Sequence, residues 1–402
     1  MTLMDTAQRD RWLLPEGVEE VLPQEARNLE RLRRRLLDLF DVWGYQLVIP
    51  PFIDYVESLL TGTGRELDLQ TFKLTDQLSG RMLGIRADMT PQVARLDAHH
   101  LKREEPTRLC YIGTVLHTVG DHLEKSRSPI QVGAELYGHR GAASDLEIIR
   151  LMLELLAQSG VLDVHLDLGN VAIYRELVRQ AGLDGDQEAA LFDVLQRKAQ
   201  VELRELLDVY GVQGQLRDMF LQLPDLNGGA ELLPRARAVL AGAGAVVADA
   251  LAELETVWNQ LRQRFPSLPI YVDLAELRGY HYQTGMVFAA FVPGCGKEVA
   301  RGGRYDEIGK IFGRARPATG FSADLKVLAR LGAPSAPESD RGAIFAPAGD
   351  DPGLWDAIRD LRAEGKTVIE ALPGQVGDAA AMGCGLRLEK TAAGWVATPV
   401  AR

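Results

Sequence analysis

The chain has few cysteines and no long apolar run, and each shortage excludes a class of protein. Its three cysteines, Cys110, Cys295 and Cys384, lie far apart in the sequence, so we expect neither a paired disulfide framework nor a Cys-x-x-Cys metal site. No stretch approaches the roughly 20 apolar residues that a membrane span needs, and residues 1–13 lack the apolar run of a signal peptide. We therefore expect a cytoplasmic protein that does not enter membranes.

The chain is also short of positive charge and of familiar catalytic motifs. It has 45 Lys and Arg against 56 Asp and Glu, a net charge of −11. Nucleic-acid binding depends on Lys and Arg releasing counterions from phosphates, so this balance disfavours a nucleic-acid partner. The phosphate-binding loop, the His-Glu-x-x-His zinc motif and the Gly-x-Ser-x-Gly nucleophile motif do not occur. We predict no metal and no cofactor.

Length and composition indicate two folded domains. At 402 residues the chain exceeds the usual size of a single core, while 46% hydrophobic and 25% charged residues are typical of globular proteins. Residues 333–340 are rich in Pro and Ser, which predicts a linker between a core at 1–332 and a small module at 341–402. Within that module, strands at 343–346 and 367–370 around a helix at 353–364 predict a small α/β unit.

The hydrophobic pattern of the core indicates an α+β fold. A three- and four-residue spacing predicts a helix from Pro23 to Gly44, with the run Arg33 to Arg35 on its solvated face, followed by a strand at 45–49. Short strands broken by turns favour an antiparallel sheet. Residues 171–265 read as a helical insertion. The other predicted strands are 71–74, 81–85, 109–116, 130–137, 164–168, 270–274 and 286–291, and the other predicted helices are 91–101, 144–157 and 323–331.

Four segments concentrate charge, glycine and amide groups, and they are the candidate site: Arg86 to Thr90, Gln131 to Glu135, Arg278 to Gly285, and Arg301 to Asp306. Because side chains alternate along a strand, Gln131, Gly133 and Glu135 share one face. A bound amino acid needs a carboxylate for its ammonium, a guanidinium for its carboxylate and, if it is histidine, an acceptor for an imidazole N–H. Asp88, Arg278 and Glu135 supply these groups in that order. Each segment alone also fits a structural turn or a satisfied polar network.

Taken in order, the segments resemble the histidyl-tRNA synthetases, which have the class II synthetase fold. Gly44 to Pro51 is similar to the first class II motif, which implies a homodimer. Arg86 to Thr90 resembles the family's Arg-Pro-Glu-Gly-Thr, Gln131 to Glu135 its Gln-Leu-Gly-x-Glu, and Arg278 to Thr284 its Arg-Gly-Leu-Asp-Tyr-Tyr-Thr, while Gly302 to Asp306 matches Gly-Gly-Arg-Tyr-Asp outright. The resemblance covers nearly all of residues 10–332. It implies a histidine pocket lined by Asp88, Thr90, Gln131, Glu135, Arg278 and Tyr282, with Gln283 where the family has a second tyrosine.

Departures from the synthetase pattern predict that the chain does not activate an amino acid. Two arginines that hold ATP phosphates in class II synthetases are replaced here by His117 and Val327, although Lys125 and Arg127 are nearby in the sequence. Loss of each phosphate donor costs about 3 kcal/mol by analogy with oxyanion-hole deletions, so adenylate formation should be negligible. The C-terminal module is near neutral and shorter than the anticodon-binding domain expected of a synthetase.

The pattern is similar to a second family, the synthetase-like regulatory subunits of ATP phosphoribosyltransferase, whose version of the first string resembles Arg86 to Gln92. This resemblance implies a homodimer within a hetero-oligomer that also contains a short catalytic subunit, the enzyme of the first step of histidine biosynthesis. It also implies that the chain stimulates this catalytic subunit and mediates its feedback inhibition by histidine. Two alternatives stay open: a histidyl-tRNA synthetase with unusual phosphate ligands, and an amino-acid-binding or amino-acid-ligating paralogue that acts on another protein.

Overall fold

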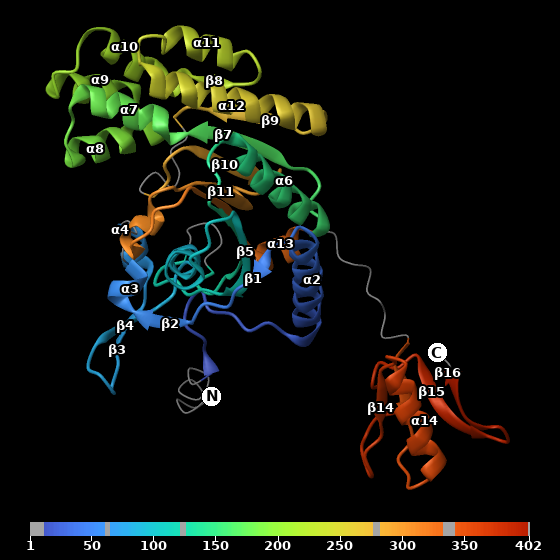
Figure 1. Ribbon diagram of the computed structural model, residues 1–402. Coiled ribbons are helices and arrows are strands. Elements are labelled where there is room, and N and C mark those ends of the chain that lie inside the picture. The colour runs from blue at the N-terminus through green and yellow to red at the C-terminus, as the bar shows by residue number, and fades with distance from the viewer. Residues whose placement is uncertain (1–11, 61–64, 121–125, 276–281, 333–341, 401–402) are drawn as a thin grey trace, which may run out of the picture. The chain divides into compact units, whose positions relative to one another are not determined.

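The fold consists of two compact units, residues 1–332 and 333–402, each with its own core. The computed structural model describes residues 12–60, 65–120, 126–275, 282–332 and 342–400 (Figure 1). The predicted linker at 333–340 lies outside these residues.

A nine-stranded sheet forms the centre of the first unit. Its order is β1-β5-β6-β12-β11-β10-β7-β9-β8. The neighbours are antiparallel except for β1 with β5 and β7 with β9, which are parallel. The predicted α+β class is therefore confirmed. The strands are β1 (Gln46–Leu47), β5 (Thr107–Thr114), β6 (Ile130–Tyr137), β7 (His165–Asn170), β8 (Asn227–Gly228), β9 (Ile270–Asp273), β10 (Met286–Phe291), β11 (Ala300–Arg304) and β12 (Ala318–Asp324).

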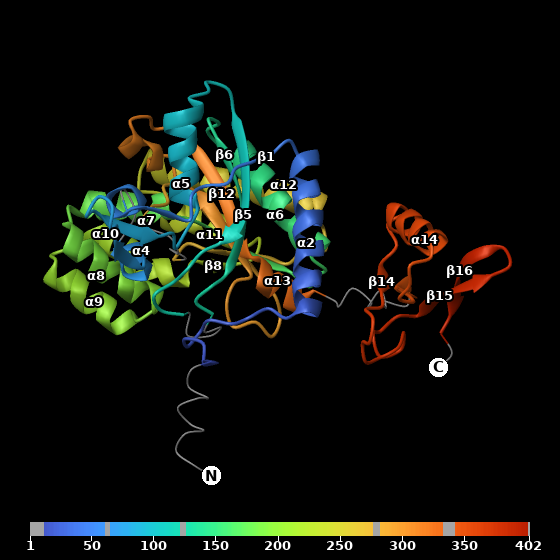
Figure 2. The same ribbon diagram turned by 90° about the horizontal axis from the view of Figure 1, so that it is seen from below.

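Long helices cover one face of this sheet. The predicted first helix is α2 (Pro23–Val42), which buries Leu29, Leu32 and Leu36 and leaves its arginine-rich side toward solvent. It ends at Val42, and Gly44 follows two residues later with a φ of +77°, in the left-handed region that favours glycine. Helices α6 (Ala142–Gln158) and α13 (Leu325–Leu331) pack beside α2 (Figure 2). Their apolar faces pack against the face of the sheet that carries Cys110, Val132 and Leu166, and together they form the main core.

The segment predicted as a helical insertion, 171–265, consists of helices joined by short turns and includes one two-residue strand, β8. Helix α12 runs back along the others and contacts α6, α7 and β7, which joins the insertion to the sheet (top of Figure 1). The helices are α7 (Val171–Ala181), α8 (Gly185–Gln196), α9 (Gln200–Val209), α10 (Gly214–Gln222), η3 (Leu223–Asp225), α11 (Leu232–Val239) and α12 (Ala245–Arg264).

The opposite face of the sheet carries shorter elements and a second, smaller core. Met89, Val93, Tyr111 and Tyr305 belong to this core. The predicted helix at 91–101 is an α-helix that continues as one turn of π-helix, where the buried Asp97 pairs with Arg316 at 2.8 Å. These elements are α3 (Val56–Leu60), α4 (Arg65–Gln70), α5 (Thr90–Arg95), η2 (Leu96–Leu101), η4 (Ile308–Phe312) and a small sheet of β2 (Ile53–Tyr55), β4 (Met82–Ile85) and β3 (Lys73–Thr75).

The second unit is a four-stranded sheet with one helix. Strand order is β14-β13-β15-β16, and the parallel pair β13–β14 is joined through α14, as predicted for the α/β module. The hairpin formed by the last two strands was not predicted. The elements are β13 (Ile344–Ala346), α14 (Pro352–Ala363), β14 (Val368–Glu370), β15 (Leu386–Thr391) and β16 (Gly394–Pro399).

Several predicted boundaries were wrong by about two residues, among them those of the final core helix and of the strand predicted at 71–74. The final core helix begins at Leu325 rather than at 323, because Ala323 and Asp324 end strand β12 and the Asp324 carboxylate caps the helix by accepting from the Lys326 N–H at 3.0 Å. In the strand predicted at 71–74, Thr71 makes only an isolated bridge to His117.

Candidate functional site

The candidate site lies on the face of the large sheet opposite α2 and α6. Gln131, Gly133 and Glu135 share this face of β6, as the alternation predicted. Directly opposed residues on neighbouring strands also share a face, so Tyr111 stands beside Gly133, and Gly320 beside Glu135. Two of these positions, Gly133 and Gly320, carry no side chain of their own.

Side chains from neighbouring strands lie directly over Gly133 and Gly320. A Cβ on Gly133 would lie 2.5 Å from the Tyr111 hydroxyl, and a Cβ on Gly320 would lie 1.6 Å from Glu135 Oε2. The ring of Tyr111 therefore occupies the space above Gly133. The glycines let buried polar groups from three strands come within hydrogen-bonding distance.

Glu135 is the centre of a buried hydroxyl cluster. Its side chain is only 1% exposed, and its Oε1 accepts hydrogen bonds from Tyr111 at 2.9 Å and Thr90 at 3.1 Å. The Tyr305 hydroxyl donates to Oε2. Burial raises the pKa of Glu135 to about 8, with a smaller contribution from the negative charge of Asp88, although the three hydroxyl donors oppose the shift.

Asp88 and Gln131 form a second network next to Glu135. The Gln131 amide donates to Asp88 Oδ1 at 2.8 Å, and its oxygen accepts from the Met89 N–H at 2.9 Å. Asp88 Oδ1 also accepts from the Thr90 N–H at 3.0 Å, which fixes the turn that starts α5. The structure thus brings four of the predicted site residues together: Asp88, Thr90, Gln131 and Glu135.

Two further predicted residues reach the same region from the loop before β10. The ring of Tyr282 meets that of Tyr305 edge-on, with centroids 6.4 Å apart. Gln283 is 4% exposed, and its Oε1 lies where a Cβ on Gly303 would be 2.7 Å away. Arg278, predicted to bind a ligand carboxylate, lies outside the described residues.

Two residues, Tyr111 and Tyr305, donate hydrogen bonds to Glu135, and the sequence analysis gave neither of them a role. Tyr305 belongs to the Gly302 to Asp306 string, so the sequence placed it in the candidate site but did not predict its hydrogen bond to Glu135. Tyr111 sits in an ordinary apolar strand, and only the register of β5 against β6 brings it to the site.

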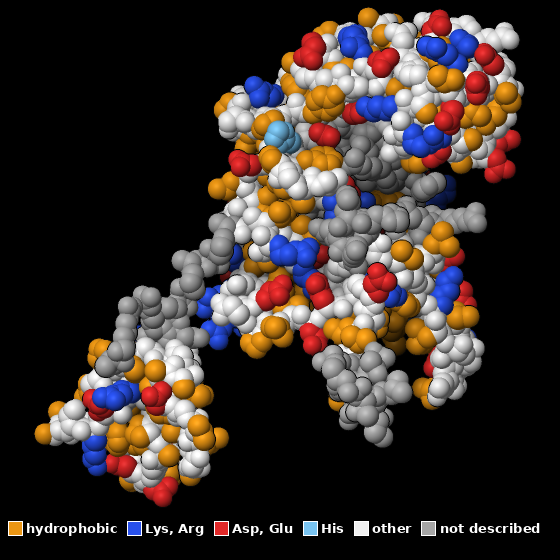
Figure 3. Space-filling model, turned by 180° about the vertical axis from the view of Figure 1, so that it is seen from behind, with side chains coloured by type: hydrophobic (Ala, Val, Ile, Leu, Met, Phe, Trp, Pro, Cys, Tyr) orange, Lys and Arg blue, Asp and Glu red, His pale blue; other side chains and the backbone are white. Residues whose placement is uncertain are grey.

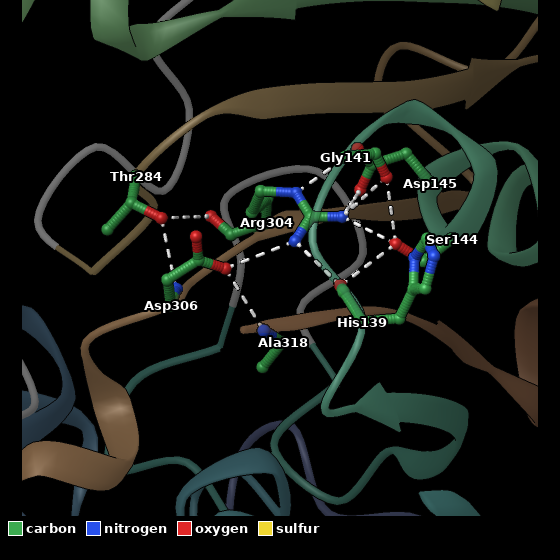
Figure 4. Close-up of polar contacts among 8 residues, drawn as sticks. All are labelled: His139, Gly141, Ser144, Asp145, Thr284, Arg304, Asp306 and Ala318. Carbon is green, nitrogen blue, oxygen red and sulfur yellow. Dashed lines mark hydrogen bonds and ion pairs between the residues drawn. The ribbon is translucent and has the colours of Figure 1, made fainter. Parts of the chain in front are cut away.

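Arg304, in the middle of the same string, has a structural role (Figure 4). Its guanidinium is buried and pairs with Asp145 at 2.9 Å and Asp306 at 3.1 Å. It also donates to the Ser144 hydroxyl and to backbone oxygens at the start of α6. The Asp306 N–H in turn donates to Thr284 Oγ1 at 3.0 Å. This network connects the end of β11, which Tyr305 follows directly, to α6 and to the loop that carries Gln283.

His117 and Val327, expected from the resemblance to replace phosphate-binding arginines, both contact other parts of the protein. His117 Nε2 is 2.9 Å from the Ala87 carbonyl oxygen, and Val327 is buried in the main core. Arg127 donates to the His117 carbonyl at 3.0 Å and stacks over the Phe72 ring. Lys125, the other cation expected nearby, lies outside the described residues.

Lys326, the cation beside Val327, is also engaged in contacts within the protein. Its ammonium pairs with Glu19 at 3.2 Å, and its side chain is 7% exposed.

In the described part of the chain, no group of three or more His, Cys, Asp or Glu side chains is placed to hold a metal ion. Among the described helices, none is both long enough and apolar enough to span a bilayer.

The comparisons with known proteins agree with this geometry. Residues 17–328 match the histidyl-tRNA synthetase family, and residues 341–398 match the ATP phosphoribosyltransferase subunit HisZ C-terminal domain. The ATP phosphoribosyltransferase regulatory subunit of Methylococcus capsulatus is 61% identical over 98% of this chain and 97% of its own length. That of Thioalkalivibrio sulfidiphilus is 60% identical over 93% and 95%.

A solved structure extends the match to three dimensions. A crystal structure described as an ATP phosphoribosyltransferase regulatory subunit/histidyl-tRNA synthetase from Bacillus halodurans C covers 92% of this chain and 95% of its own, with a TM-score of 0.79 and 28% identity. The chain therefore belongs to the family of ATP phosphoribosyltransferase regulatory subunits, which is built on the fold of histidyl-tRNA synthetase.

Proposed function

We propose that this chain binds the catalytic subunit of ATP phosphoribosyltransferase, stimulates it, and transmits feedback inhibition by histidine without activating an amino acid itself. The proposal rests on one site that keeps the groups for binding an amino acid and lacks those for binding ATP phosphates. The polar groups suited to an amino acid are assembled, whereas the positions that should hold ATP phosphates carry a histidine bonded to the backbone and a buried valine.

The assembled groups fit free histidine. Asp88, half-buried and held by Gln131, offers a carboxylate to the ligand ammonium. We assign the ligand carboxylate to the Arg278 guanidinium, as the sequence analysis expects. Tyr282 stands at the rim of the hydroxyl cluster around Glu135, where an imidazole can pack against its ring.

The absence of adenylation follows from the same site. Charge that builds on the ATP phosphates in the transition state needs fixed cations, and the described cations nearest the former phosphate positions, Arg127 and Lys326, are engaged with protein groups. Two lost donors at about 3 kcal/mol each reduce the rate by about 10⁴-fold.

Binding of tRNA is not part of the proposed function. The net charge is −11, and in Figure 3 basic and acidic side chains are interspersed over the helical insertion rather than gathered by sign. A phosphate-binding surface needs basic side chains gathered on one face.

We further propose a homodimer in the cytoplasm, formed through the segment that resembles the first class II motif. Apolar side chains around this segment are exposed in the single chain: Val42 at 79%, Leu47 at 45% and Ile49 at 82%. Exposed apolar groups gathered in one place are typical of a protein interface.

Feedback inhibition requires that histidine bind two states of the assembly with different affinity. We propose that bound histidine favours the state in which the catalytic subunit is less active. A coupling of 1–3 kcal/mol, the usual range, shifts the equilibrium between the two states by about 5–150-fold.

Affinity capture from the source cell tests the partnership. With the tagged chain as bait, phosphoribosyltransferase should be recovered, and neither tRNA nor an unrelated target should be. The purified chain should show no histidine-dependent exchange of pyrophosphate into ATP. Exchange at a synthetase's rate, or capture without phosphoribosyltransferase, would contradict the proposal.

A further inference from the structure

The loop at 86–92, which supplies two of the site residues, is hydrogen-bonded to the proline segment, Pro50 to Phe52. The Arg86 guanidinium donates to the first carbonyl oxygen of this segment at 2.6 Å, and the Arg86 N–H donates to the third at 3.1 Å. The Gln92 side-chain nitrogen donates to the middle one, on Pro51, at 3.0 Å. The loop therefore holds all three consecutive carbonyl groups of the proline segment.

These contacts matter because proline cannot be held by the usual backbone bonds. Pro50 and Pro51 have no backbone N–H, so neither can donate to a neighbouring strand. Both prolines also lie between strands β1 and β2, outside either strand. Their carbonyl oxygens need donors from elsewhere in the chain, and Arg86 and Gln92 supply them.

Arg86 and Gln92 are buried, with exposed fractions of 7% and 2%, and have few other polar contacts. Arg86 forms no ion pair with a carboxylate among the described residues, although a buried charge usually has one. Its Nε instead donates to the Thr114 carbonyl oxygen at the end of β5, at 2.9 Å. Within the described part of the chain, the bond to Pro51 is the one hydrogen bond that the Gln92 side chain makes. The two side chains thus serve mainly to join the loop to the proline segment.

The other side of the loop forms part of the proposed histidine site. Asp88 Oδ1 accepts from the Gln131 amide at 2.8 Å, and the Thr90 hydroxyl donates to Glu135 at 3.1 Å. Both of these loop residues lie between the two residues that hold the proline segment. A shift of the proline segment therefore displaces the groups that would bind the ligand.

We propose that Arg86 and Gln92 couple the histidine site to the homodimer interface, so that the dimer binds histidine more tightly than the monomer does. The inference rests on the proposed function and on the proposed interface. Ile49 directly precedes the proline segment and is 82% exposed in the single chain, so a second copy packed on it restricts this segment. The hydrogen bonds pass this restriction to the loop, and histidine binding then loses less conformational entropy. By thermodynamic linkage, histidine strengthens dimerisation by the same factor.

Sedimentation equilibrium of the full chain, with and without saturating L-histidine, measures the coupling as the ratio of the two dimer dissociation constants. Gln92→Met keeps the length of the side chain and removes the donor to Pro51. Arg86→Lys keeps the positive charge but replaces the planar fork of donors by a single ammonium group. Gln196→Met, at a half-buried glutamine whose amide donates to the Ala275 carbonyl oxygen at 3.4 Å, is the matched control.

Histidine should lower the dissociation constant of the wild-type dimer at least about fivefold. In Gln92→Met and Arg86→Lys this shift should fall to about twofold or less, although both variants still bind histidine and form dimers. Gln196→Met should keep the wild-type shift. A residue that only stabilises the fold changes the amount of folded chain and leaves this ratio unchanged. If Arg86→Lys does not fold, Gln92→Met alone decides the result.

Failure of the inference and failure of the proposed function give different results. A wild-type chain that binds histidine and dimerises without any shift would overturn the coupling while the regulatory function stands. A full shift in every folded variant would overturn the role of Arg86 and Gln92 in the same way. No histidine binding by the wild-type chain, or no stimulation of the phosphoribosyltransferase by it, would remove the proposed function and the inference with it.

Discussion

At the scale of single residues, the site consists of a buried carboxyl group surrounded by hydroxyls. The pKa of Glu135 is about 8 in the folded protein against 4.5 for an ordinary glutamate. Between these values the folded protein holds a proton that the unfolded chain has lost. The stability that this proton contributes is complete below pH 4.5 and disappears as the pH rises through 8.

Replacement of Glu135 by Gln should therefore flatten the dependence of stability on pH. The free energy of unfolding of the wild type should fall between pH 6 and pH 9. Glu135 is already ionised in the unfolded chain, whereas in the folded protein its ionisation places a charge in a buried site. Glu135→Gln cannot ionise and should lose less over the same range. Urea unfolding at the two pH values measures the difference, and an equal loss in both proteins would contradict the assignment of the raised pKa.

Gly320 should tolerate no side chain, because a Cβ there would lie 1.6 Å from Glu135 Oε2 and 2.8 Å from the Ala134 carbonyl oxygen. Gly320→Ala should cost about 1–3 kcal/mol of stability, as overpacking does, and should weaken histidine binding by displacing Glu135. Gly185→Ala, where a Cβ meets nothing within 4 Å, is the control. Unfolding and calorimetry of both variants measure the two effects; wild-type binding by Gly320→Ala would refute the close fit.

The sequence predicted part of this residue-scale arrangement. Gln131 and Glu135 could be placed on one face because strand side chains alternate with period two. The partners of Glu135 could not be predicted, since Tyr111 and Gly320 reach it only through the register of β5 and β12 against β6. Register is set by the whole sheet and leaves no local mark in the sequence.

At the scale of elements, the Arg304 network determines where β11 lies. Arg304→Met should cost about 3–5 kcal/mol, because the fully buried Asp145 would lose its cation. Arg197→Ala should cost little, since its pairs with Asp193 and Glu202 are solvent-exposed. Chemical denaturation compares the two, and similar midpoints for both variants would show that the buried network contributes no more than a surface pair.

Elements with strong apolar periodicity were predicted closely, and those rich in glycine were not. Helix α2 and strand β6 follow their patterns within a few residues. Strands β11 and β12 were not predicted individually, because Gly302, Gly303 and Gly320 interrupt the alternation of apolar residues. Glycine disfavours strands by propensity, yet here it is required so that buried side chains can cross above the sheet.

At the scale of the whole molecule, we expect the exposed apolar surface beside β1 to form the interface of a homodimer. Ile49 is 82% exposed in the single chain, so Ile49→Asp should leave the monomer folded and weaken dimerisation at least about tenfold. Leu162→Asp, at a position 78% exposed elsewhere on the same unit, is the control. Sedimentation velocity over a concentration series measures both; a dimer unaffected by Ile49→Asp would place the interface elsewhere.

The central claim, that a former synthetase site now senses histidine for another enzyme, is tested most directly by phosphoribosyl transfer from phosphoribosyl pyrophosphate to ATP. The host's catalytic subunit is assayed alone, with this chain, and with this chain plus histidine. We predict stimulation by the chain and inhibition by histidine that depends on the chain. A rate unchanged by the chain, together with histidine-dependent pyrophosphate exchange by the chain alone, would contradict the claim and identify a working synthetase.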